Sequence, residues 1–221
     1  KYGELTLREN QIAYAEPSFF RLFDFELLKG DKKTCLSMPG QVVITERIAS
    51  KYFKDEDPIG KIFIFTGAYD KISCEVTGVM KEMPSNSHIH YSFLISYKSL
   101  PKYMQEYWYK HEAYTYVLLD SPERKAEIER EFPVMAEKYK TEEALKNKTW
   151  GVDLVPLADI HLTPQLGYEM ETKGNRSAMI ALVFAAIAIL AIAWINYINL
   201  TVARSMERAR AVSYTHLTLP T

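Results

Sequence analysis

The chain has 221 residues, enough for one or two domains with a substantial core. Its 27 lysines and arginines balance 28 aspartates and glutamates, and no basic run is long enough to follow a phosphate backbone, so nucleic acid is not an expected partner. Cys35 and Cys74 are too few for a disulfide framework. A bridge between them stays open, although we expect two unpaired, small apolar side chains.

The first predicted elements lie in residues 11–30. A short extended run leads to Glu16 and Pro17, and proline suits the first turn of a helix. The apolar side chains of residues 19–23 then predict a short helix, and an alternating pattern predicts a strand that ends at Gly30. We interpret the phenylalanines of this region as core residues rather than as a ligand-binding aromatic box.

Residues 41–60 form the clearest local unit. The apolar residues 42–44 predict a strand, and Thr45 is placed to cap the helix that follows. Apolar residues at helical spacing predict an amphipathic helix, which the turn-rich residues 57–60 end. A strand, a cap, a helix and a turn therefore follow one another.

A hairpin should come next, with strands at 61–65 and 72–80. The loop at 83–87 should then lead to a further strand, which carries His88 and His90. Residues two apart on a strand face the same side, so both imidazoles could reach one metal ion. The completing ligands would have to come from His111, Glu112 or His161. A pair of histidines supplies only two of the three or four ligands that zinc needs, and no third ligand has a recognised spacing, so we expect no metal site.

Aromatic residues are dense between residues 97 and 116. They could form a surface for a partner, but tyrosine and tryptophan also fill half-buried β surfaces, which is the interpretation that we favour. Ser121 and Pro122 predict the start of a helix with one core-facing side, which Pro133 should kink or interrupt. A last strand and turn are expected at residues 150–162.

Residues 177–203 form an uncharged stretch between Arg176 and Arg204. At about 1.5 Å per residue a helix of this length spans roughly 40 Å, more than the hydrocarbon core of about 30 Å, so it can cross a membrane at a tilt. The stretch is too long and too evenly apolar to be the buried helix of a soluble core. Asn196 and Asn199 share a face of this helix and are predicted to hydrogen-bond neighbouring helices, while a position near the headgroups stays equally open.

The charges beside this helix favour a cytoplasmic C-terminal end by a narrow margin. Lys173 and Arg176 precede the helix, and Arg204, Arg208 and Arg210 follow it. Arg204 and Arg208 are predicted to anchor the cytoplasmic end.

Five blocks of sequence carry a family resemblance. They are AEPSFFRLFDFELLKGD (15–31), VVITERIASKYFKDEDPIGK (42–61), VTGVMKEMPSNSHIHYSFLIS (76–96), LADIHL (157–162) and INYINLTVARSMERAR (195–210). Together they resemble the MacB-like periplasmic core domain and the following transmembrane helix of FtsX/MacB-like ABC transporter permeases, of the type found in Bacteroidetes. The second and the last block are the most specific.

We expect an α+β periplasmic domain at residues 1–176, a transmembrane helix at 177–203 and a cytoplasmic segment at 204–221. The resemblance implies a place in the bacterial inner membrane, no metal role for His88 and His90 at the start of a strand, and no cofactor. It also implies a cytoplasmic ABC ATPase, a second permease copy, membrane lipid and a periplasmic adaptor as partners.

Permeases of this family have four transmembrane helices, so the resemblance implies that the chain is a fragment that begins inside the periplasmic domain. Family members act as mechanotransmitters, in which ATP-driven dimerisation of the ATPases moves the helices and the motion reaches the periplasmic domains. After Ala211 the sequence VSYTHLTLPT departs from the family pattern, and we expect residues 212–221 to be non-native.

Two other classes of protein compete with this interpretation. A membrane-anchored module that senses a ligand outside the cell is the alternative, and it would place a signalling domain after Arg210. An enzyme is not expected, because the sequence has no G-x-S-x-G or H-E-x-x-H motif and no convincing carboxylate pair. The resemblance does not choose among peptide or drug export, lipoprotein release and control of cell-wall hydrolases as the process served.

Overall fold

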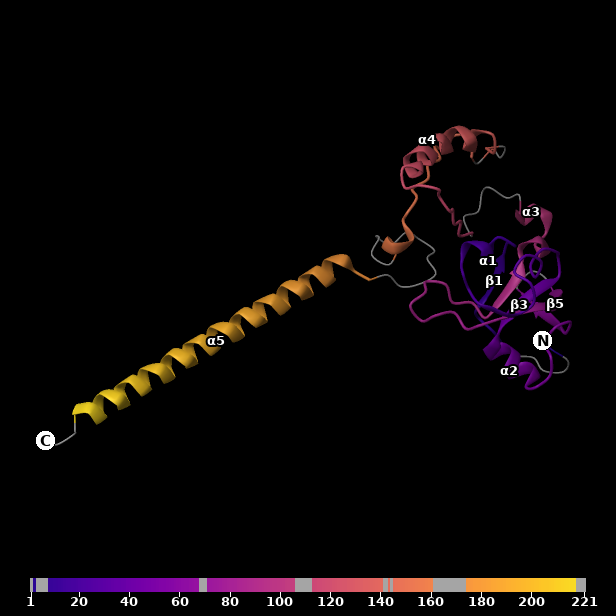
Figure 1. Cartoon of the computed structure of the whole chain (residues 1–221). Coiled ribbons are helices and arrows are strands. Elements are labelled where there is room, and N and C mark those ends of the chain that lie inside the picture. Colours follow the sequence, from indigo (N-terminus) through magenta and orange to yellow (C-terminus); the bar gives the residue numbers. More distant parts are fainter. Residues whose placement is uncertain are drawn as a thin grey trace. The chain divides into compact units, whose positions relative to one another are not determined.

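A computed structural model describes residues 2, 8–67, 71–105, 113–140, 143, 145–160 and 174–217, with side chains up to residue 213. The chain divides into two compact units, Lys1–Leu154 and Val155–Thr221. The regular elements, shown in Figure 1, are β1 (Ile12–Ala15), α1 (Phe19–Leu22), β2 (Leu27–Lys29), β3 (Gln41–Thr45), α2 (Glu46–Phe53), β4 (Ile62–Thr66), β5 (Lys71–Met80), β6 (Phe93–Ser96), η1 (Tyr97–Ser99), α3 (Lys102–Gln105), α4 (Arg124–Glu137), η2 (Leu157–Asp159) and α5 (Arg176–Leu217).

The first unit is built on a mixed six-stranded sheet in which the strands follow the order β1-β6-β3-β5-β2, and β4 also pairs with β5. The pairs β1/β6 and β3/β5 are parallel, whereas β3/β6, β2/β5 and β4/β5 are antiparallel. The predicted hairpin is confirmed, with Ile62 opposite Glu75 and Thr66 opposite Lys71. A mixed sheet with helices confirms the predicted α+β fold.

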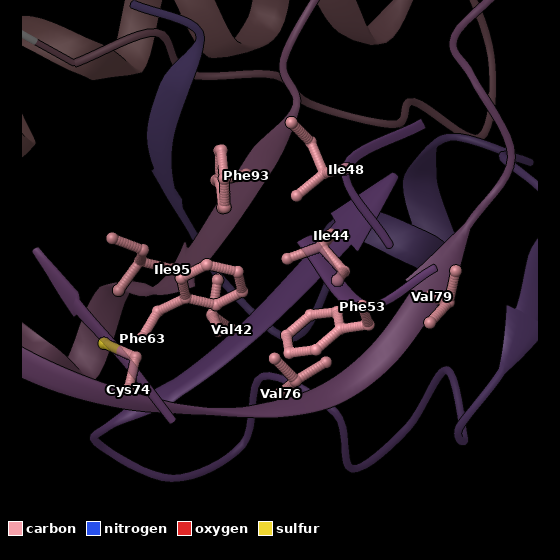
Figure 2. Close-up of a cluster of buried hydrophobic side chains, with 10 residues drawn as sticks. All are labelled: Val42, Ile44, Ile48, Phe53, Phe63, Cys74, Val76, Val79, Phe93 and Ile95. Atoms are coloured by element: carbon pink, nitrogen blue, oxygen red, sulfur yellow. The ribbon is translucent and has the colours of Figure 1, made fainter. Parts of the chain in front are cut away.

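Both faces of the central strands are covered by apolar side chains. Val42 and Ile44 of β3 belong to one buried cluster, and Val43 between them belongs to another. Figure 2 shows the first cluster, to which α2 contributes Ile48 and Phe53. Successive residues of a strand point to opposite faces, so a strand that is buried on both sides has a continuous apolar run rather than an alternating one.

The two cysteines lie in different clusters. Cys74 of β5 belongs to the first cluster and Cys35 to the second, and both are buried and free. The prediction of two unpaired, small apolar side chains is confirmed.

Helix α2 begins after Thr45, as predicted, but the Thr45 side chain does not cap it. Thr45 is fully buried at the end of β3, and its Oγ1 has no hydrogen-bond partner among the described residues. The backbone N–H of Arg47 in the first turn donates instead to the carboxylate of Glu82 at 3.3 Å. The prediction was wrong because the strand that ends at Thr45 directs this side chain into the core.

The strand predicted to begin near His88 begins later. β6 starts at Phe93, and residues 88–92 are irregular. The prediction that residues 97–116 form a half-buried β surface was also wrong for the part that is described: η1 and α3 lie there, and residues 113–116 belong to no strand. Tyr107, Trp108 and Tyr109 lie outside the described residues.

Helix α4 differs from its prediction in two ways. It is continuous through Pro133, so the proline does not interrupt the helix, although it removes one backbone donor. Its expected core-facing side is poorly covered: Ala136 is its buried residue, and Val134 is 72% exposed. The strand expected from residue 150 is absent over residues 150–156, where the N–H of Leu154 donates to Glu129 of α4 at 2.8 Å instead of to a strand.

The second unit contains α5, a single unbroken helix of 42 residues (Figure 1). At about 1.5 Å per residue it is roughly 63 Å long. Among the described residues it is the one helix that is long and apolar enough to cross a membrane, and its most apolar window is not buried by the rest of the chain. The predicted helix is confirmed, and it continues beyond Ala203 to Leu217.

Candidate functional site

Helix α5 carries all four residues predicted to act in the membrane. Its first turn is capped by Asn175, whose Oδ1 accepts a hydrogen bond from the N–H of Ala178 at 3.1 Å. From this cap the helix continues without a break through Asn196, Asn199 and the two arginines. All of these side chains are exposed.

Asn196 and Asn199 lie on the side of α5 that carries small residues. At about 100° per residue, Ala181, Ala185 and Ala203 fall on the same side as the two asparagines. Ile192 lies within this row, and Ile189, seven residues before Asn196, borders it. Among the described residues neither amide side chain has a hydrogen-bond partner, and both are exposed. Small residues allow close approach of another helix in a membrane, and amide side chains can hydrogen-bond across that contact.

The opposite side of α5 carries large residues. Val183, Ile187 and Leu190 are followed on this side by Trp194 and Tyr197, all of them more than half exposed. Arg204 and Arg208, the predicted anchor, continue the same row beyond the aromatic residues. The helix thus has one side of small and amide residues and one of large apolar, aromatic and basic residues.

A polar cluster in the first unit joins four residues from three separate parts of the chain. Arg47 of α2 donates from Nη2 to Ser92 Oγ at 2.7 Å, and Ser92 Oγ donates to Gln11 Oε1 at 2.8 Å. Arg47 Nε lies 3.6 Å from Glu82 Oε1. The cluster ties the chain before β1 to the first turn of α2 and to the connection between β5 and β6. The Arg47 and Glu82 side chains are half-exposed, so their ion pair adds little to stability, and the main effect of the cluster is to hold these segments in register.

A second link, on the other face of the sheet, connects His88 to Tyr116. His88 Nε2 and the Tyr116 hydroxyl are 2.7 Å apart, and the Tyr116 ring packs edge-on against Phe23 with centroids 4.9 Å apart. Burial, and then the neighbouring phenols of Tyr91 and Tyr114, raise the pKa of Tyr116 to about 12. The phenol is therefore neutral at physiological pH and acts as a hydrogen-bonding anchor for residues 113–120.

The histidines do not form a metal centre in the described part of the chain. No group of three or more histidine, cysteine, aspartate or glutamate side chains there could hold a metal ion. His111, Glu112 and His161, considered as completing ligands, lie outside the described residues.

The sequence did not predict the cluster around Arg47. Its members come from residues 11, 47, 82 and 92, and each is a polar residue with no distinctive spacing. Only the register of β1, β3 and β6 brings them together, because Gln11 precedes β1 and Ser92 precedes β6, which pairs with it.

Comparison with known proteins gives the family. The family described as the MacB-like periplasmic core domain matches residues 1–133. Among solved structures, a domain assigned to a permease protein of Porphyromonas gingivalis is 21% identical, with 60% of each chain covered and a TM-score of 0.49. The periplasmic region of MacB from Actinobacillus actinomycetemcomitans is also 21% identical, with 38% of this chain and 36% of that chain covered and a TM-score of 0.29.

The chain thus spans 60% of the first of these structures and 36% of the second. At such TM-scores the two likenesses add nothing to the assignment. Comparison with curated proteins found no significant match. The family match covers more than half of the chain, from its first residue through β6 and into α4. The chain therefore belongs to the MacB-like periplasmic core domain family of the MacB/FtsX-like permeases.

Proposed function

We propose that the chain is part of the permease of an ABC transporter and relays motion between the ATPase and a domain outside the cytoplasm. The observation that carries this proposal is the match of residues 1–133 to the MacB-like periplasmic core domain, followed in the same chain by one unbroken apolar helix. A domain joined to a membrane helix can be moved by that helix without itself carrying out chemistry.

In this account residues 1–176 lie in the periplasm, residues 177–203 cross the inner membrane and residues 204–221 begin the cytoplasmic part. The narrow excess of arginines after the helix supports this orientation. The domain has no catalytic role and no cofactor. Its motion derives from ATP hydrolysis by a cytoplasmic ABC ATPase, and a second permease copy completes the transporter.

Asn196 and Asn199 have a packing role in this account. Their exposed amides share the small-residue side of α5, which supports a contact with neighbouring helices of the permease or of its second copy. Arg204 and Arg208 hold the cytoplasmic end at the membrane surface. A periplasmic adaptor is a further candidate partner.

The test uses the full-length permease with its ATPase in proteoliposomes. Ser50 is exposed on α2, and Cys35 and Cys74 are buried, so once any cysteine elsewhere in the permease is replaced, a Ser50→Cys variant can be labelled at one position per copy. We expect the distance between labels on the two copies to change when a non-hydrolysable ATP analogue is added. A label at Ser205→Cys on α5 is the control for motion at the membrane end. A change at Ser205 with none at Ser50 would contradict the relay.

A further inference from the structure

The large-residue side of α5 has an ordered composition along its length. Trp194, Tyr197, Thr201, Arg204 and Arg208 follow one another at intervals of three and four residues, which places them on one face of the helix. We call this face the aromatic–arginine stripe. Trp194 is 76% exposed and Tyr197 is 68% exposed.

The order of residues matches the layers of a membrane. Apolar residues precede the stripe, aromatic residues begin it and arginines end it, as expected for hydrocarbon, interface and headgroups. From Arg176 to Trp194 the helix rises roughly 27 Å at about 1.5 Å per residue, close to the thickness of a hydrocarbon core of about 30 Å. With Arg176 at one boundary of the hydrocarbon core, Trp194 and Tyr197 lie at the other, and the remaining residues of the crossing segment, up to residue 203, pass through the interfacial layer.

The hydroxyl within the stripe is satisfied inside the helix. Thr201 Oγ1 donates to the carbonyl of Tyr197 at 2.9 Å. Thr201 lies between the aromatic residues and the arginines, and this bond satisfies its hydroxyl without a partner from another helix. The two amides lie on the opposite side, so the residues that need a protein partner and those that do not are separated.

Charge defines the ligand at the end of the stripe. Arg204 and Arg208 are four residues apart, which places their Cβ atoms about 6 Å from each other. Glu207 is three residues from Arg204 and lies about 60° from it around the helix, but it lies about 100° from Arg208, so Arg208 is the member of the pair that faces away from the carboxylate. Arg210 points to another side of the helix. Guanidinium groups bind phosphate oxygens with two parallel hydrogen bonds.

We propose that the aromatic–arginine stripe binds anionic phospholipids of the cytoplasmic leaflet, with Arg204 and Arg208 on the phosphates and Trp194 and Tyr197 at the level of the glycerol backbone. This inference rests on the orientation given under the proposed function. It assigns the large-residue side of α5 to lipid and leaves the amide side for other helices.

The experiment places the full chain, with Trp108→Phe and Trp150→Phe, in vesicles of phosphatidylcholine and phosphatidylglycerol. Bromine atoms are carried near the glycerol or near the ends of the acyl chains. Trp194 fluorescence should be quenched more strongly by the shallow bromines. When only phosphatidylglycerol is brominated, quenching should exceed that expected from its share of the lipid.

The matched variants are Arg208→Gln and Arg210→Gln, which remove the same charge two residues apart and differ in the face of the helix. Arg208→Gln should lower the preference for phosphatidylglycerol about fivefold, since one arginine near an anionic surface contributes about that factor. Arg210→Gln should leave most of the preference for phosphatidylglycerol unchanged. Phosphatidylglycerol that co-purifies with the chain carrying all three tryptophans, measured by mass spectrometry, gives the same comparison.

Equal loss in both variants, no preference at all, or stronger quenching by deep bromines would overturn the proposal while leaving α5 in the membrane. Absence of quenching by every brominated lipid would show that α5 is not inserted. That outcome would contradict the proposed function as well, so the two failures are distinguishable.

Discussion

Glu46 and Glu82 are hydrogen-bonded across the start of α2, although 36 residues separate them. The N–H of Glu82 donates to Glu46 Oε1 at 3.3 Å, and Glu82 Oε1 accepts from the N–H of Arg47 at 3.3 Å. This exchange resembles a capping box in its effect, because each of the two glutamate carboxylates accepts a hydrogen bond from a backbone N–H at or beside the other glutamate. Glu82 is remote in sequence from the helix that it caps.

Replacing Glu82 by alanine should therefore destabilise the first unit by about 1 kcal/mol, the usual contribution of an N-terminal cap. The measurement is urea unfolding of the full chain in detergent micelles, followed by near-ultraviolet circular dichroism of the aromatic side chains. Glu26→Ala is the matched control. Glu26 forms an exposed ion pair with Lys81 at 3.3 Å, which should contribute little. Equal losses for the two variants would show that the cap has no special effect.

Gly30 occupies a position that other residues cannot adopt without strain. Its φ is +96°, and an added Cβ would lie 2.4 Å from the carbonyl oxygen of Thr77. Thr77 lies where the register between β3 and β5 shifts, so the obstructing atom belongs to backbone that is held by the sheet. Gly30→Ala should cost at least about 2 kcal/mol, since left-handed strain and a backbone clash combine.

The control for Gly30 is Gly151→Ala, because a Cβ at Gly151 would meet nothing within 4 Å. We expect that variant to unfold at nearly the same urea concentration as the parent chain. A Gly30→Ala protein as stable as Gly151→Ala would mean that the turn after β2 can relax away from β5.

Alkaline pH should destabilise the fold through its buried cysteines. Burial raises the pKa of Cys74 from 9.0 to about 11, and burial is also the main cause that raises the pKa of Cys35 to about 11. The folded chain therefore retains protons that the unfolded chain loses. The resulting stabilisation is complete below pH 9.0 and is lost as the pH rises to about 11.

A Cys74→Ala variant provides the test, with the free energy of unfolding measured across that pH range. Its stability should fall less steeply with pH than that of the parent chain, whatever its stability at neutral pH. Both thiols should also react with a thiol reagent at neutral pH only after unfolding. Parallel pH profiles for the two proteins would contradict the assignment of this effect to Cys74.

The amide side of α5 should support assembly of the permease. In the full-length permease, Asn196→Leu combined with Asn199→Leu should weaken crosslinking between helices and the transport-dependent phenotype, because two interhelical hydrogen bonds of roughly 1 kcal/mol each would be lost. Ile195→Leu combined with Ile198→Leu has the same spacing and should change little. Unchanged crosslinking and phenotype in the asparagine variant would mean that the amides lie among headgroups.

The parts of the fold that the sequence predicts well are those set by local pattern. The apolar run 42–44, the helix after it and the hairpin of β4 and β5 are found where periodicity and turn residues place them. The uncharged stretch after Arg176 is helical, as its composition requires. Membership of the family could also be recognised from short blocks of sequence.

The errors arise where distant contacts override local preference. Thr45 has the chemistry of a cap, but the two-sided burial of β3 directs it into the core, and Glu82 supplies the cap instead. The N–H of Leu154 bonds to a side chain of α4, so the segment around it forms no strand. The cluster around Arg47 depends on the pairing of β1 with β6, which no local pattern encodes.

The most direct test of the account is the side of the membrane on which each end of α5 lies. Ser50→Cys and Ser205→Cys variants of the full-length permease would be expressed in a Gram-negative host and treated with a membrane-impermeant thiol reagent. Cys35 and Cys74 are buried, so within these 221 residues they leave a low background. We expect Ser50→Cys to be labelled in cells with only the outer membrane permeabilised, and Ser205→Cys only after the inner membrane is opened. Labelling of both positions, or of neither, before the inner membrane is opened would contradict a helix that crosses it with residues 1–176 outside the cytoplasm.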